Sequence, residues 1–189
     1  MMNEFWLYFT LGHQHVLDLG AYDHLLFLAV LSVSYQFSQW RRWGLLVSLF
    51  TLGHTLSLAA THFFGLQSNE QIVEFLIPCT IIATALYNML QIWVPSNSDH
   101  VLVLGGSALT FGLIHGLGFG RYFGVIEDQG SVMALIDFAL GIEWAQLIIV
   151  FVVLVLSFVA QRLFGIKKRD WILVASIATI AATIPMFLG

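Results

Sequence analysis

Long apolar stretches, separated by short polar segments, recur along almost the whole chain. A helix needs about 20 apolar residues to cross the ~30 Å hydrocarbon core of a bilayer, and six stretches approach or exceed that length. A backbone inside lipid must satisfy its own hydrogen bonds, so each stretch is predicted to be a helix. The first span can be extended by the less apolar segment from Leu11. The six predicted spans cover about residues 22–37, 45–64, 72–94, 101–119, 132–159 and 171–188.

This pattern predicts an all-α, polytopic membrane protein: a six-transmembrane-helix bundle that forms a single integral membrane domain over residues 1–189. The composition agrees, because 59% of the residues are hydrophobic and only 10% are charged. The mean hydropathy is +0.87, whereas soluble domains carry about 25% charged residues. The composition therefore excludes a soluble enzyme, and no basic patch suggests nucleic acid. No internal repeat is obvious.

The basic residues predict how the bundle is oriented. Six of the seven follow the first span or lie between the fifth and sixth spans, and only Arg121 falls on the opposite side. Basic loops stay in the cytoplasm. We therefore expect both termini to lie outside the cytoplasm.

A few ionisable residues interrupt the predicted spans. Each one is expensive in a bilayer, at least ~2.5–3.5 kcal/mol for an Asp, Lys or Arg at mid-depth, so each needs a reason. At ~1.5 Å per residue, five of them fall in the outer half of the bundle, away from the cytoplasm. They come from four predicted spans and are Asp23, His24, His54, His115 and Glu143.

Imidazoles and carboxylates that converge in this way are the ligands that divalent first-row metals accept. A metal ion neutralises the acids and satisfies the ring nitrogens at once. The sequence therefore predicts that these five residues bind a divalent metal such as nickel, cobalt or zinc. Other polar side chains are expected to orient the ligands or to line the entry. These are His15, Thr51, Thr55, Ser57, Glu74 and Gln146.

Three glycines around His115 have a predicted packing role. Gly112, Gly116 and Gly120 recur every four residues, which places them on one helix face and lets a neighbouring helix approach closely. A lone histidine in a membrane helix can instead form a hydrogen bond between helices, so this second interpretation stays open for each one. It is also open whether His13, His15 and His62 join the site.

Five ordered segments resemble the HupE/UreJ family of small bacterial membrane proteins. They cover roughly residues 15–150 and read HVLDLGAYDHLLFL, LFTLGHTLSLA, IVEFLIPCTII, FGLIHGLGF and FALGIEWAQL. The resemblance implies a protein of the bacterial inner membrane that takes up nickel or cobalt, and it assigns the metal to the five residues named above. Two positions depart from the expected motifs: Gly112 stands where typical nickel permeases have a first histidine, and Ala139 where an asparagine is expected.

Two functions follow from this interpretation. The first is a permease for a divalent transition metal, with the cluster as its outward-facing capture site. The alternative is an intramembrane zinc-dependent hydrolase of a lipid or amide substrate, in which His24, His54 and His115 bind zinc and Asp23 or Glu143 is the general base. The expected partners are the metal ion and the lipid bilayer, and oligomers are possible.

Overall fold

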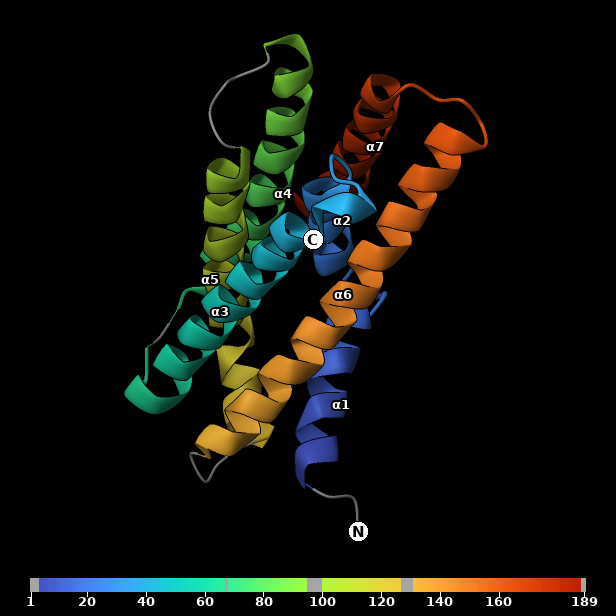
Figure 1. Ribbon diagram of the computed structural model, residues 1–189. Helices are drawn as coiled ribbons and strands as arrows, with labels where there is room; N and C mark the ends of the chain where they lie inside the picture. Colours follow the sequence, from blue (N-terminus) through green and yellow to red (C-terminus); the bar gives the residue numbers. More distant parts are fainter. Residues whose placement is uncertain (1–3, 67, 95–99, 127–130, 188–189) are drawn as a thin grey trace.

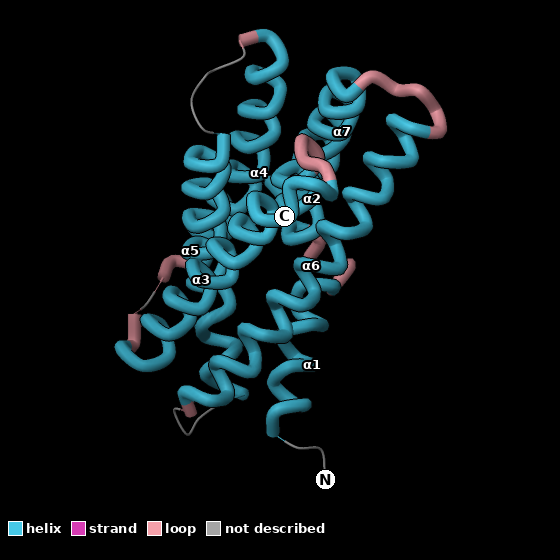
Figure 2. The backbone as a smooth tube through the Cα atoms, viewed as in Figure 1, coloured by secondary structure: helices cyan, strands magenta, loops and turns pink. Residues whose placement is uncertain are grey.

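The computed structural model describes residues 4–66, 68–94, 100–126 and 131–187 (Figure 1). In these ranges every regular element is a helix, as the cyan tube in Figure 2 shows. The predicted polar loop at 95–99 and the predicted end of the last span at Leu188 lie outside the described residues. The elements are α1 (Glu4–Leu17), α2 (Asp23–Ser32), η1 (Phe37–Gln39), α3 (Trp40–Phe64), α4 (Glu70–Trp93), α5 (His100–Ile126), α6 (Val132–Arg162), α7 (Lys168–Thr183) and η2 (Ile184–Phe187).

Five of the helical segments are long and apolar enough to cross a membrane, and the all-α polytopic architecture is confirmed. Four of the predicted spans end within a few residues of the helices that contain them, while α5 continues beyond the predicted end of its span to Ile126. The five segments cover Phe37–Phe64, Glu70–Trp93, Val101–Gly120, Val132–Arg162 and Lys168–Phe187.

The first predicted span needs correction. Its helix, α2, has only 10 residues and is about 15 Å long, half the thickness of the hydrocarbon core. A separate helix, α1, precedes it, and Figure 1 shows the two following one another along the bundle. The Asp18 side chain accepts a hydrogen bond from the Gly20 amide at 2.8 Å, the local turn that Asp favours. This turn ends α1, and the chain resumes as a helix at Asp23.

The α2 helix lies inside the bundle and packs against α4, α6 and α7. Asp23 and His24, at its start, are buried, and so are most residues of its later turns. The break between α1 and α2 therefore brings a helix end, with two polar side chains, into the interior of the protein.

The α3 and α5 helices are in direct backbone contact through glycines. A Cβ atom at Gly53 would collide with the carbonyl oxygen of Leu109, and one at Gly112 would collide with that of Phe50. Farther along the pair, Gly116 faces His54 and Gly120 faces Thr61. A side chain at any of these glycines would push the helices apart, so the small residues set the spacing of this pair.

The α1 and α6 helices meet in the same way. A Cβ at Gly12 would collide with the carbonyl oxygen of Phe138, and one at Gly141 with that of Phe9. The two pairs also share short sequence matches: Gly-x-x-His ends at His15 and at His115, and Phe-x-Leu-Gly ends at Gly53 and at Gly141. In Figure 1, α1 and α6 run upward while α3 and α5 run downward. The bundle therefore contains two similar helix pairs of opposite direction.

Six basic residues gather at one end of the bundle, which we call the basic end. It is formed by the starts of α3 and α7 and the ends of α4 and α6. The seventh basic residue, Arg121, lies in the later turns of α5, toward the opposite end. The six residues of the basic end are Arg41, Arg42, Arg162, Lys167, Lys168 and Arg169.

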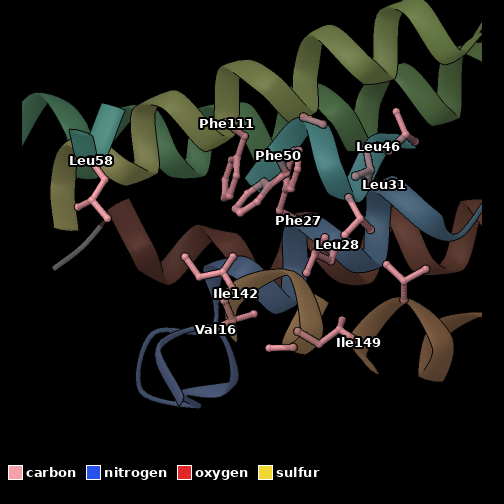
Figure 3. Close-up of a cluster of buried hydrophobic side chains, with 14 of the residues drawn as sticks. Val16, Phe27, Leu28, Leu31, Leu46, Phe50, Leu58, Phe111, Ile142 and Ile149 are labelled. Atoms are coloured by element: carbon pink, nitrogen blue, oxygen red, sulfur yellow. The ribbon is translucent and has the colours of Figure 1, made fainter. Parts of the chain in front are cut away.

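Three fully buried phenylalanines hold the centre of the core. Phe27 and Phe111 stack with ring centroids 3.9 Å apart. Phe50 packs at 5.9 Å from Phe27 and 5.3 Å from Phe111, and Figure 3 shows the three rings together. This phenylalanine layer joins α2, α3 and α5.

Candidate metal centre

Four histidines from four helices converge beside the phenylalanine layer. They are His15 of α1, His24 of α2, His54 of α3 and His115 of α5, here called the histidine cluster. The closest ring centroids are those of His24 and His115, at 4.0 Å. The remaining centroid distances lie between 4.9 and 6.3 Å.

Three members of the cluster have ligand atoms close enough to share a metal ion. One ring nitrogen each of His15, His24 and His115 lies within 4.8 Å of the others. Around a tetrahedral zinc with metal–nitrogen distances of 2.0–2.1 Å, ligand atoms are ~3.4 Å apart. Small rotations of the rings are therefore enough to bring the nitrogens to coordination distance.

Asp23 adds a carboxylate to the cluster. One of its oxygens lies 3.2 Å from Nδ1 of His24, and the other lies 3.7 Å from Nε2 of His115. The first oxygen also accepts a hydrogen bond from the backbone amide of His24 at 2.7 Å. Asp23 thus satisfies an amide at the start of α2 and places a negative charge beside two imidazoles.

Most ring nitrogens of the cluster are buried without a hydrogen bond. Both nitrogens of His24 and of His54, Nε2 of His15 and Nδ1 of His115 have no hydrogen-bond partner among the described residues, although Nδ1 of His24 lies 3.2 Å from the Asp23 carboxylate. A buried polar atom left unpaired costs roughly 1–3 kcal/mol. A cation held by the imidazoles would satisfy several of these nitrogens at once, so the donor set fits a metal ion.

The cluster is open on one side and closed on another. His15, its partly exposed member, lines a groove of about 520 Å³ between α1 and α5. On the side of the phenylalanine layer, His24 packs against Phe50 with ring centroids 5.6 Å apart and against Phe111 at 6.5 Å. The groove is completed by Leu11, Gln14, Asp18, Phe119 and Tyr122.

The structure brings Asp23, His24, His54 and His115 together, but it does not bring Glu143 to them. The carboxylate of Glu143 accepts a hydrogen bond from the Ser48 hydroxyl at 2.7 Å. The apolar segment that contains His115 ends at Gly120. His115 therefore lies about 8 Å from that end of the span, while α5 itself continues to Ile126.

The residues predicted to orient the ligands make other contacts. Thr51 donates to the Gln146 side chain at 3.1 Å, and Ser57 donates to the carbonyl oxygen of His54 at 3.1 Å. Thr55 is half-buried, and Glu74 is exposed on α4. Within the described residues, none of these side chains hydrogen-bonds to an imidazole nitrogen of the cluster.

His13 and His62 lie outside the cluster. His13 stacks on Phe9, and His62 packs against Phe63 and Phe123. His15, for which the sequence left open whether it joins the site, lies within the cluster. One sequence feature could have predicted this position of His15. The Gly-x-x-His pattern occurs in both α1 and α5, and it makes His15 the counterpart of His115. Nothing in the sequence pointed to the phenylalanine layer.

Two amide substitutions separate the roles of the acidic residues. Asp23→Asn is expected to weaken binding of Ni²⁺ or Co²⁺ by about 10–100-fold, the usual effect of altering a group that contacts metal ligands. Glu143→Gln is expected to leave affinity within about twofold, because Glu143 bonds to Ser48 and not to the cluster. Calorimetric titration of both variants measures the difference. Equal losses would place Glu143 at the metal.

The sequence pattern that describes the HupE / UreJ protein family matches residues 1–188. No match was found among curated proteins or among solved structures. The match covers almost the whole chain, including all four histidines of the cluster, Asp23 and Glu143. The protein therefore belongs to the HupE/UreJ family.

Proposed function

We propose that this protein is a permease that carries a divalent transition metal across the bacterial inner membrane, with the histidine cluster and Asp23 as its binding site. The family is associated with nickel and cobalt transport. The observation that carries the proposal is the convergence of four imidazoles and one carboxylate, with most of the ring nitrogens buried and unpaired. The class of ion and the binding site are part of the proposal.

The donor set favours one class of ion. Imidazole nitrogens suit nickel, cobalt, zinc and copper, whereas calcium and magnesium prefer oxygen ligands. Alkali metals are likewise poor partners for neutral imidazoles. Binding requires unprotonated rings, so metal affinity should fall as the solution is acidified. Nickel and cobalt are the first candidates, because the family is associated with them.

The surroundings of the cluster suit a transport intermediate. The groove at His15 offers access from one side, and the phenylalanine layer blocks the other. If the basic end faces the cytoplasm, as basic residues generally do, the groove belongs to the outward-facing half. We therefore assign this structure to a state that can take up metal from outside while the path inward is closed.

Transport into sealed vesicles tests the proposal. Purified protein in liposomes containing a trapped metal indicator is expected to admit Ni²⁺ or Co²⁺. His54→Ala should reduce uptake by at least ~10-fold, because it removes one of the converging imidazoles. His62→Ala is the matched control: it lies on the same helix but outside the cluster, and it should transport as the native protein does.

The outcome also distinguishes the alternative function. An intramembrane hydrolase would retain zinc in a fixed ratio, hydrolyse an amide or ester and pass no ion into the vesicles. That combination, obtained with folded protein, would overturn the permease proposal. Uptake that persists in His54→Ala would overturn the proposed binding site while leaving transport intact.

A further inference from the structure

A second polar pocket lies at the basic end, and it shares no residue with the histidine cluster. It has a volume of about 280 Å³ and is enclosed by residues from the starts of α3, α5 and α7, the end of α4 and the segment after α2. Its polar side chains come from Ser34, Tyr35, Gln39, Arg42, Tyr87, Asn88, Gln91 and Lys168. Nothing in the proposed transport cycle uses this pocket.

The charge of the pocket is positive. Arg42 and Lys168 both line it, and no acidic residue does. Neither Arg42 nor Lys168 forms an ion pair in the described part of the chain. Two unpaired cations facing one space attract an anion, and they exclude this pocket as a resting place for the transported metal.

The start of α7 reinforces this preference. Lys168 is the first residue of this 16-residue helix, and no side chain caps the helix start. The first amides of a helix lack partners within the helix and carry partial positive charge. Oxyanions bind readily at such helix starts.

An unpaired buried hydroxyl supplies an independent sign of a ligand. Tyr35 is only 5% exposed, and its hydroxyl has no hydrogen-bond partner among the described residues. Burial raises the pKa of Tyr35 to about 12. Nearby Arg42 lowers this pKa and nearby Tyr87 raises it, but burial has the largest effect. The hydroxyl therefore remains protonated, and it is a donor without a hydrogen-bond partner on a residue that lines the pocket.

The geometry points to a phosphate-binding pocket formed by Arg42, Lys168 and the Tyr35 hydroxyl, whose ligand is the phosphate of an anionic lipid headgroup or free inorganic phosphate. Arginine and lysine are the side chains that bind phosphate. Gln39 and Ile92, which line the pocket, are each followed in the chain by an exposed tryptophan, Trp40 and Trp93, of the kind found at the membrane interface. Basic pockets between membrane helices also bind acidic headgroups. The inference does not depend on metal transport.

Binding measurements on the full-length protein in neutral detergent test the pocket. The probes are inorganic phosphate, phosphatidylglycerol and the zwitterionic phosphatidylcholine, each added at constant ionic strength. We expect phosphatidylglycerol or phosphate to raise the melting temperature, and phosphatidylcholine to have little effect. A response to phosphate identifies a free anion, and a response to phosphatidylglycerol alone identifies a lipid headgroup. No response to either overturns the proposal.

Variants locate the binding. Arg42→Gln and Lys168→Gln should each weaken binding by at least ~10-fold, as expected for loss of a charged hydrogen bond. Arg41→Gln is the matched control, because Arg41 lies over the Trp40 ring and does not line the pocket. Equal losses in Arg41→Gln and Arg42→Gln would show only a diffuse attraction to the basic end and overturn the assignment.

Tyr35→Phe gives a second readout that a purely structural role would not produce. Removing an unpaired buried hydroxyl should leave the melting temperature of the ligand-free protein unchanged or higher. The increase on adding the anion should shrink, because one donor is lost. A variant that melts lower without ligand and responds fully to the anion would contradict the role of Tyr35.

Discussion

Gly112→Ala is expected to lower the stability of the bundle by about 2 kcal/mol or more, the range found when a close-packed interior is overfilled. The added methyl group would collide with the carbonyl oxygen of Phe50 and lie 2.9 Å from the backbone nitrogen of His54. Both obstacles belong to the backbone of α3, so no side chain can rotate away. The two helices must separate, and His115 must move relative to His54.

Gly106→Ala is the matched control for this experiment. Gly106 lies on the same helix, and a Cβ built there meets nothing within 4 Å. Alanine is favoured over glycine in a helix by about 1 kcal/mol, so this variant should melt at the same temperature or slightly higher. Thermal unfolding in detergent should place Gly112→Ala about 4–8 °C below the native protein. Equal melting of the two variants would show that the α3–α5 contact is looser than described.

His24→Ala is expected to weaken binding of Ni²⁺ or Co²⁺ by more than about 100-fold, since even residues that only support metal ligands change affinity by 10–100-fold. The ring of His24 makes the two closest approaches in the cluster, with centroids 4.0 Å from His115 and 4.9 Å from His15. It is also fully buried. Its removal takes away the imidazole nearest to both of these rings.

Affinity is measured by competition with a coloured metal indicator, and the absorption spectrum of bound Co²⁺ reports its ligands. His24→Gln accompanies His24→Ala because it preserves more of the volume in the core. His62→Ala, outside the cluster, should bind as the native protein does. A folded His24→Gln variant with unchanged affinity and an unchanged cobalt spectrum would remove His24 from the site.

The sequence predicted the membrane helices well because their signal is additive. Each of the five long segments sums the hydropathy of many residues, so single exceptions such as Glu74 do not hide it. The break between α1 and α2 depends instead on one local contact, between Asp18 and Gly20. An apolar stretch continues past this turn, and hydropathy alone cannot separate a short buried helix from a complete span.

The members of the site were harder to predict, because depth along a helix does not fix the direction of a side chain. Glu143 has a suitable depth but reaches Ser48 on α3, whereas His15 reaches the cluster. Both directions follow from how α1 and α6 cross, and that crossing is fixed by Gly12 and Gly141. Gly12 and Gly141 lie far apart in the chain, so the sequence alone did not indicate that they belong to one helix contact.

The short length of α2 has a consequence for the ion as well as for the fold. A helix end inside a bilayer is tolerated only where protein screens it from lipid, and here α4, α6 and α7 form that screen. The same end turns about half a positive charge toward the cluster and repels a cation. Asp23 offsets this repulsion without adding a second acid. In the proposed site a transition metal would thus meet nearly neutral surroundings, which would favour its departure as much as its arrival.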